Sequence, residues 1–243
     1  MRVATWNLER RKPTSPRGAE AITYLQSVSA DLVVITETRI SFGLPGGTTA
    51  WSEPPVGSRF APDERKVVLW SAYDFDVINV DSPIDSTRFV AARVHTPLGS
   101  LVVLAVCITW HMAEVTYHHG PKKKPWEEHF AYLEHLVPIV DSIDEPLVVA
   151  GDFNQRYPRV KGGNLKAAAA LEATFKDLTI VTAGTLTGCT RPGIDHIAIS
   201  SELTASNVVG WPNNVTGNRL SDHDGAACDV APVSGSIRTD FAI

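Results

Sequence analysis

Four clusters of polar residues suited to phosphate chemistry lie at the ends of apolar, strand-like runs or beside them. The central cluster closes the segment 146–154, PLVVAGDFN, in which an apolar run leads through a glycine into Asp152 and Asn154. The glycine frees the backbone to turn, and residues two apart on an extended chain point the same way. Gly-Asp-x-Asn is also a common turn sequence. The functional interpretation of this pair is a carboxylate and an amide delivered to one phosphate.

The other three clusters are a WN pair, a TE pair and an SDH triplet, which place beside strands the residues Asn7, Glu37, Asp222 and His223. Hydrolysis of a phosphodiester needs an ion to offset charge on the phosphoryl oxygens, a positioned water and a group that transfers protons. The four clusters contain residue types for all three tasks. Because each cluster adjoins a strand, we expect them to form one shared site.

In the order WN, E, GDFN and SDH, these clusters resemble the endonuclease/exonuclease/phosphatase family, the DNase I-like metal-dependent phosphoesterases. The resemblance runs from Trp6 to His223, nearly the whole chain. It implies an α/β fold, a four-layer sandwich in which helices flank two packed mixed sheets. The mixture of strands and helices along the chain agrees with that architecture. The site is then expected where the ends of both sheets meet.

Metal binding is expected at Glu37, because Mg²⁺ prefers a site with one or two carboxylates and several retained waters. The resemblance adds Asn7 as a neutral oxygen ligand, direct or through water. It also adds Asp222 as a carboxylate that binds directly or supports a ligand. The expected ion is Mg²⁺, with Mn²⁺ as a substitute, and whether one or two ions bind stays open.

Proton transfer is expected at His223, where a carboxylate on the other ring nitrogen would fix the tautomer and raise the basicity. The resemblance implies that Asp195 is this carboxylate. It also implies that Asp152 orients or deprotonates the attacking water and that Asn154 donates to a phosphate oxygen. His111 corresponds to a family position that often carries histidine. Whether Asp152 or His223 is the general base stays open.

Three further histidines have non-catalytic interpretations, one as a structural residue and two as solvated side chains. His196 falls on the strand face opposite Asp195, and His118 and His119 lie in a loop without a partner at metal-ligand spacing. We therefore expect none of the three to take part in the chemistry.

Positive residues gather in three loops, each next to a predicted catalytic strand end. They are expected to form a positive rim that steers a polyanion, with aromatic side chains nearby for stacking on an unpaired base. The expected substrate-binding residues are Arg10, Arg11, Lys122, Lys123, Lys124, Arg156 and Tyr157. The net charge is -5, from 22 Lys and Arg against 27 Asp and Glu. A protein that grips long duplex DNA through many phosphates would be basic, so any contact with nucleic acid is expected to be local.

The composition is that of a globular protein, with 44% hydrophobic and 20% charged residues. A single domain is expected over residues 1–243, with the last ten or so residues as a frayed tail. The chain has no apolar run of membrane-spanning length and no signal-peptide pattern, which predicts a cytoplasmic protein without membrane contact. Three widely spaced cysteines predict neither a disulfide framework nor a zinc site, and Cys107 is expected in the core. No obligate protein partner is indicated.

Periodicity predicts the elements that position these residues. The expected strands are 2–7, 31–37, 66–71, 75–80, 88–95, 100–109, 147–150, 195–200 and 225–230. The expected helices are 16–29, with Ala19, Ile22, Leu25 and Val28 on its apolar face, 125–143, with Phe130, Leu133, Val137 and Val140, and 162–175. Pro138 is expected to kink the second helix or end it early. Segment 41–62, rich in Gly and Pro, is expected to be a long loop.

The sequence therefore predicts a divalent-metal-dependent phosphodiester hydrolase, a nuclease acting on DNA or RNA, with endonuclease activity preferred. The alternatives are a phosphatase of a small phosphorylated molecule or lipid headgroup, and a non-catalytic nucleic-acid-binding relative. Thr36 departs from the family pattern, which often has Gln there, but the departure removes no ligand. The complete set of polar residues argues against the non-catalytic alternative. The choice between DNA and RNA and between internal and terminal cleavage stays open.

Overall fold

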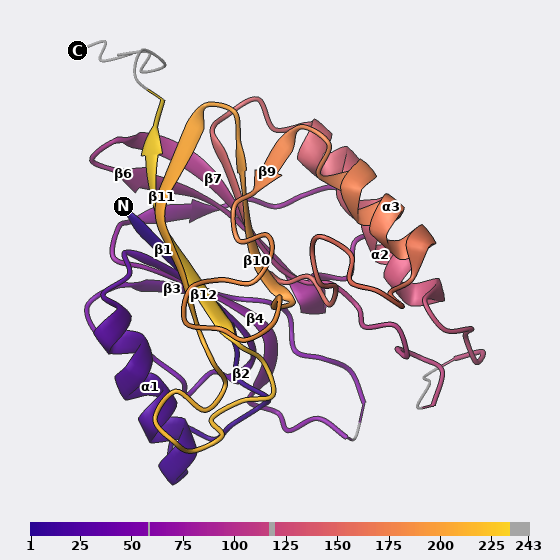
Figure 1. Cartoon of the computed structure of the whole chain (residues 1–243), viewed down its shortest axis with the longest axis horizontal. Helices are drawn as coiled ribbons and strands as arrows, with labels where there is room; N and C mark the ends of the chain where they lie inside the picture. The colour runs from indigo at the N-terminus through magenta and orange to yellow at the C-terminus, as the bar shows by residue number, and fades with distance from the viewer. Residues whose placement is uncertain (58, 117–119, 234–243) are drawn as a thin grey trace.

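The protein is arranged in four layers (Figure 1). The computed structural model describes residues 1–57, 59–116 and 120–233. Helix α1 (Pro16–Val28) lies on the outer side of one six-stranded sheet, and helices α2 (Glu127–Asp141) and α3 (Leu165–Thr174) lie on the outer side of a second one. The predicted four-layer α/β sandwich with two mixed sheets is confirmed.

Both sheets have six strands. The first sheet contains, in spatial order, β11 (Leu203–Trp211), β12 (Gly225–Pro232), β1 (Arg2–Asn7), β2 (Leu32–Arg39), β4 (Glu64–Ser71) and β3 (Thr48–Trp51). The second contains β5 (Phe75–Val77), β6 (Phe89–Thr96), β7 (Gly99–Cys107), β8 (Leu147–Asp152), β10 (Asp195–Ser200) and β9 (Leu178–Ile180). A short 3-10 helix, η1 (Ser86–Arg88), precedes β6.

Each sheet has one parallel pair of strands at its centre. β1 and β2 are parallel and are joined through α1, while β7 and β8 are parallel and are joined through α2. In such a unit both strands end at the same edge of the sheet. Asn7 therefore ends β1 close to the end of β2 that carries Glu37, and Asp152 ends β8. β10 runs antiparallel to β8 and begins at Asp195, opposite Asp152.

Strand β8 is buried on both faces, as its unbroken apolar run predicts. Val148 and Ala150 belong to the core between the two sheets, whereas Leu147 and Val149 face α2 and α3. Burial of a large aliphatic side chain contributes about 1.5–3 kcal/mol. The strand that delivers Asp152 is therefore anchored from both sides.

The apolar face predicted for the first helix is partly wrong. Ser15 caps α1 by accepting from the N–H of Gly18 at 3.1 Å, and Leu25 is buried as expected. Ala19 is exposed, whereas Ala21 is buried. Successive residues in an α-helix are about 100° apart, so four residues at strict threefold spacing drift across the helix surface instead of sharing one face.

Helix α2 begins at Glu127 and continues past Pro138 to Asp141, so the predicted early end is not observed. Pro138 and Glu134, whose carbonyl would bond to an N–H at position 138, both lie on the exposed face. Water can therefore satisfy the carbonyl that the proline leaves without a donor. Phe130 and Val137 are only half-buried, and the buried face instead includes His129, Tyr132, Leu133, Leu136, Ile139 and Val140.

The segment 41–62, predicted as a long loop, contains the edge strand β3. β9 and β11 were also not predicted, and β5 ends at Val77 instead of residue 80. Cys107 is buried and all three cysteines are free, as predicted. None of the helices in the described ranges has the length and apolarity needed to cross a membrane. His118, His119 and the predicted tail fall outside the described residues.

Candidate active site

Asp152 and Asn154 are joined by a tight turn, not by the extended chain that their spacing suggested. Asn154 has a φ of 53°, and its backbone N–H donates to Asp152 Oδ1 at 2.8 Å. Its side-chain amide donates to Asp152 Oδ2 at 2.9 Å and to the carbonyl of Ile108 at 2.7 Å. Before the turn, Gly151 has a φ of 140°, and a Cβ there would lie 1.9 Å from the carbonyl oxygen of Val106. Only glycine therefore fits the close approach of β7 and β8 that places Asp152.

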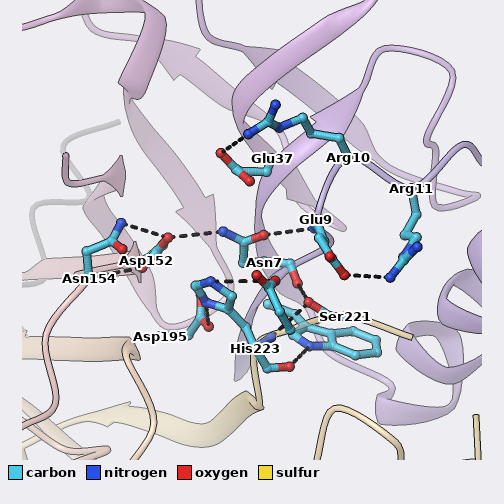
Figure 2. Close-up of polar contacts among 12 residues, drawn as sticks. Asn7, Glu9, Arg10, Arg11, Glu37, Asp152, Asn154, Asp195, Ser221 and His223 are labelled. Carbon is cyan, nitrogen blue, oxygen red and sulfur yellow. Dashed lines mark hydrogen bonds and ion pairs between the residues drawn. The ribbon is translucent and has the colours of Figure 1, made fainter. Parts of the chain in front are cut away.

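Asn7 connects the two sheets at this point. Its side-chain amide donates to Asp152 Oδ2 at 3.0 Å, and its Oδ1 accepts from the N–H of Glu9 at 2.9 Å. Figure 2 shows Asp152 between Asn7 and Asn154, so that an amide from β1 and an amide from the turn after β8 share one carboxylate. The side chains of both Asn7 and Asp152 are buried. The ends of the two sheets thus meet where the sequence predicted.

His223 is held by contacts from three directions. Its Nδ1 donates to Asp195 Oδ2 at 2.7 Å, which confirms the predicted pairing (Figure 2). Its N–H donates to Ser221 Oγ at 3.1 Å, and its carbonyl accepts from Trp6 Nε1 at 2.9 Å. Because Nδ1 is engaged, Nε2 is the ring nitrogen available for chemistry. Asp222 is half-exposed, and its Oδ1 lies 3.8 Å from that nitrogen.

Glu37 has cationic neighbours. It has a φ of 47°, and the antiparallel pairing of β2 with β4 places Lys66 opposite it. Lys66 Nζ donates to Glu37 Oε1 at 2.5 Å, and an Arg10 guanidinium nitrogen lies 3.5 Å from the same oxygen. Burial would raise the pKa of Glu37, but the charges of Lys66 and Arg10 outweigh burial and lower this pKa to about 2. The carboxylate is a permanent anion at neutral pH.

Asp152, Asp195 and His223 have coupled charges. Burial raises the pKa of Asp152 to about 7, although the charge of His223 opposes the rise. Burial alone would lower the pKa of His223, but Asp195 and Asp152 raise it to about 10. His223 is therefore an imidazolium at neutral pH, paired with a buried carboxylate.

Several oxygen donors near this point suit a hard cation. Asp152 and Asp195 each offer a carboxylate oxygen, and these oxygens lie within 4.8 Å of each other and of a ring nitrogen of the protonated His223. Asp195 Oδ1 is buried and has no hydrogen-bond partner among the described residues. Together with the ionised Glu37 and the amide oxygen of Asn7, these atoms form a set dominated by oxygen, which Mg²⁺ prefers.

A buried network of neutral side chains, not predicted from the sequence, supports the Asp152 turn. His129 Nδ1 donates to the carbonyl of Thr109 at 2.6 Å, so its Nε2 accepts from Gln155 Nε2 at 2.5 Å. The carbonyl of Gln155 accepts from His196 Nε2 at 3.0 Å, and His196 Nδ1 accepts from Thr182 Oγ1 at 3.1 Å. Burial lowers the pKa of both histidines to about 4. The ring of His129 thus ties Gln155, next to Asn154, to Thr109, and the ring of His196 ties Gln155 to Thr182.

The predicted rim residues have mixed surroundings. Arg10 contacts Glu37, and Arg11 donates to Glu9 Oε2 at 2.5 Å and to the carbonyl of Leu220 at 3.1 Å. Lys123 lies 3.5 Å from Glu127 and 3.4 Å from Glu128. The remaining predicted residues are Lys122, Lys124 and Arg156, which are exposed, and Tyr157, which is half-buried. Their binding of substrate stays a prediction.

His111 lies in an aromatic cluster after β7. Its ring centroid is 5.4 Å from that of Trp110 and 5.4 Å from that of Trp126. The side chain is exposed, and the backbone carbonyl accepts from the N–H of Trp126 at 2.7 Å. Its contact with a phosphate or a leaving oxygen stays a prediction.

Residues 4–223 match the model of the Endonuclease/Exonuclease/phosphatase family. The chain belongs to this family. Membership places the protein among phosphoesterases and nucleases in general and does not specify its substrate. No curated protein sequence matches this family member.

Solved structures of similar fold include an AP endonuclease from Archaeoglobus fulgidus, with a TM-score of 0.69 and 15% identity over 94% of this chain and 98% of that one. The endonuclease/exonuclease/phosphatase from Bacteroides vulgatus has a TM-score of 0.68 and 14% identity, with 96% and 98% of the two chains covered. A variant of the 3' phosphatase NExo from Neisseria, bound to product DNA hairpin, has a TM-score of 0.63 and 19% identity, with coverage of 94% and 98%. At these identities the likeness concerns the fold.

Proposed function

We propose that this family member is a divalent-metal-dependent phosphodiester hydrolase, a nuclease that cleaves DNA or RNA internally. The observation that carries the proposal is the convergence of the polar clusters from both sheets. Asn7 contacts Asp152 at 3.0 Å, and Asp195, opposite Asp152 in the sheet, holds His223 at 2.7 Å. The set therefore combines a buried carboxylate, an imidazolium and oxygen donors for an ion.

The metal would be held by Glu37 and Asn7, with Asp222 as a further carboxylate. These residues fit a hard cation because Glu37 stays ionised and Asn7, paired with Thr36 on the neighbouring strand, offers an amide oxygen at the same edge of the sheet. A bound Mg²⁺ or Mn²⁺ supplies positive charge that offsets the charge developing on the phosphoryl oxygens. The ion pair with Lys66, at Oε1 of Glu37, competes with a cation for this carboxylate.

The geometry supports a division of proton transfer between Asp152 and His223. His223 Nδ1 is engaged by Asp195, and its Nε2 also lies near the carboxylate of Asp222. An imidazolium in this setting donates from Nε2 to a phosphate oxygen or to the leaving oxygen. Asp152 is then the acceptor for the proton of the attacking water.

Asn154 is the proposed donor to a phosphate oxygen, but its side-chain amide already makes two hydrogen bonds. Both are from Nδ2, one to Ile108 and one to Asp152. Donation to substrate therefore requires that one be exchanged, and the bond to Asp152 is the one that proton uptake by that carboxylate weakens.

The choice of nucleic acid as substrate is supported by similar structures and by the surface. Two of these structures are an AP endonuclease and a 3' phosphatase bound to product DNA hairpin. Exposed cations lie after β7 and after the Asp152 turn. The second candidate, a phosphatase of a small phosphorylated molecule, is favoured by the pairing of Arg11 and Lys123 with carboxylates, which reduces the positive rim.

A substrate panel tests the proposed function. Plasmid DNA, single-stranded DNA, RNA, inositol phosphates and a phosphomonoester are incubated with Mg²⁺ or with EDTA, and Glu37→Gln serves as the control. We expect cleavage of a nucleic acid that requires Mg²⁺ and is impaired in the variant. Cleavage of only the phosphomonoester or the inositol phosphates would replace the nuclease by the phosphatase, and equal rates in EDTA would reject the metal requirement.

A further inference from the structure

A pocket adjoins the candidate active site at Lys66. It has a volume of about 210 Å³, and its lining includes Phe60, Lys66, Thr87, Arg88, Thr109 and Trp110. Pockets for drug-sized ligands usually measure about 300–1,000 Å³. The occupant is therefore a small group, of the size of a phosphate with part of its sugar.

Two cations in the pocket wall are largely buried and held in place. The side chain of Lys66 is 6% exposed and donates to Glu37. The side chain of Arg88 is 15% exposed, and its guanidinium donates to the carbonyl of Cys107 at 3.3 Å and lies 3.4 Å from Asp85. Burial of a charge is costly unless an opposite charge accompanies it, and each of these cations has a carboxylate beside it. Because both side chains are already held in place, binding of an anion would cost little further ordering.

The same wall gathers cations around one aromatic ring. Arg59, Lys66 and Arg10 lie 4.9, 5.2 and 5.9 Å from the ring centroid of Phe60. Four cations are paired with three carboxylates here: Arg10, Arg59, Lys66 and Arg88 with Glu37, Asp85 and Glu114. Glu128, which also lines the pocket, shares Lys123 with Glu127. With these groups the five cations and five carboxylates balance, and a metal ion on Glu37 would make the wall positive.

We propose that this pocket binds a second phosphate group of the substrate, the one next to the scissile phosphate along a nucleic-acid strand, with Lys66 and Arg88 as its ligands. The proposal rests on the proposed function, because the scissile phosphate must occupy the centre formed by Asp152 and His223. Lys66 has two partners that compete for it. Its ammonium has three N–H donors, so it can contact the substrate phosphate while it pairs with Glu37, and a cation on Glu37 would weaken that pairing and leave the ammonium to the phosphate.

Isothermal titration calorimetry in EDTA tests the subsite without turnover. The probes are the dinucleotide dTpdT and the same dinucleotide with a 5′-phosphate or a 3′-phosphate. We expect one phosphorylated form to bind about tenfold more tightly than dTpdT, as for a hydrogen bond to a charged group. Lys66→Met removes this preference and Lys66→Arg retains it. Lys176→Met is the matched control, because Lys176 also pairs with carboxylates, Asp141 and Asp177, away from the pocket.

A second comparison isolates the proposed competition between Glu37 and the phosphate for Lys66. Glu37→Gln should release Lys66 and tighten binding of the phosphorylated probe, and Lys66→Met in the Glu37→Gln background should abolish the gain. If Glu37→Gln still tightens binding of the phosphorylated probe when Lys66 is replaced by Met, the tightening comes only from the loss of the negative charge of Glu37. That result would overturn the proposal. The same conclusion follows if folded Lys66→Met keeps the preference. If binding of inorganic pyrophosphate depends on Lys66 in this way and binding of neither phosphorylated dinucleotide does, the pocket binds a small phosphorylated substrate and not a nucleic-acid strand.

Cleavage of the nucleic acids of the substrate panel in Mg²⁺ separates the two proposals. A preference for the phosphorylated probe without any cleavage would leave the subsite intact and reject the nuclease. Cleavage without the preference would reject the subsite alone.

Discussion

Glu37 and Asp152 belong to one candidate active site but have opposite surroundings. Lys66 and Arg10 contact Glu37, whereas Asp152 receives hydrogen bonds from the amides of Asn7 and Asn154 and lies opposite a second carboxylate. The pKa of Glu37 is accordingly lowered to about 2, and burial raises that of Asp152 to about 7. One carboxylate is a fixed anion suited to an ion, and the other can exchange a proton near neutral pH.

The difference comes from the strand beside each carboxylate. β4 pairs with β2 and supplies Lys66 opposite Glu37. β10 pairs with β8 and supplies Asp195 opposite Asp152, and Asp195 in turn holds His223. Two similar βαβ units thus acquire different chemistry from their antiparallel neighbours.

The largest effect is expected for Asp152→Asn, which removes the proposed proton acceptor while retaining the shape of the side chain. Turnover at saturating metal and substrate should fall about 10²–10⁴-fold, the usual contribution of a general base. Initial rates on the preferred substrate measure this loss. A fall of less than threefold would remove Asp152 from the proton transfer.

Glu37→Gln should mainly weaken metal binding, because it removes the principal charge from the proposed ligand set. Calorimetric titration with Mn²⁺ should show at least about a tenfold rise in dissociation constant. Asp152→Asn in the same titration serves as the comparison and should change the constant less. The reverse order would mean that the ion is held at Asp152.

Asp195→Asn should act more mildly than loss of His223, since the imidazole is misoriented but not deleted. Turnover should fall about 10–100-fold, as for other carboxylates that orient a functional histidine. The pKa of His223 should also drop from about 10, because Asp195 is the leading charge that raises it. NMR titration of the ring follows this shift, and an unchanged titration would contradict the pairing.

The smallest effect concerns stability and contrasts the buried neutral histidines with the charged His223. The pKa of His129 and His196 is about 4 in the folded protein, against about 6.5 when unfolded. The unfolded state therefore binds more protons between these values, so the stabilisation present above pH 6.5 is lost as the pH falls towards 4. Each ring contributes up to about 3 kcal/mol. Urea unfolding of the wild type and His196→Gln at pH 7.5 and pH 5 measures the loss, which should be smaller in the variant.

The site residues that lie at the ends of strands could be predicted from the sequence. Asn7, Asp152 and Asp195 each follow or begin an apolar run, and Asp195 and His223 were expected to pair. The four-layer sandwich was implied by the family resemblance, with which the mixture of strands and helices agreed. In these cases the sequence pattern and the position in space carry the same information.

Lys66, Arg88 and the network around Gln155 could not be predicted, because they depend on pairing between distant elements. Lys66 stands within an ordinary strand sequence and acquires its importance only when β4 lies beside β2. Edge strands β3 and β11 also lacked a clear alternation. In β11 the pairing register shifts between Ser206 and Val209, and Asn207 has a φ of 48°. Such an irregularity breaks the period on which strand prediction depends.

The division of roles between Glu37 and Asp152 is tested most directly by the dependence of hydrolysis rate on Mn²⁺ concentration in wild type, Glu37→Gln and Asp152→Asn. Excess ion can offset a weakened binding site by mass action but cannot replace a missing proton acceptor. We therefore expect high Mn²⁺ to restore much of the rate of Glu37→Gln and little of that of Asp152→Asn. Equal restoration of both variants would contradict the account.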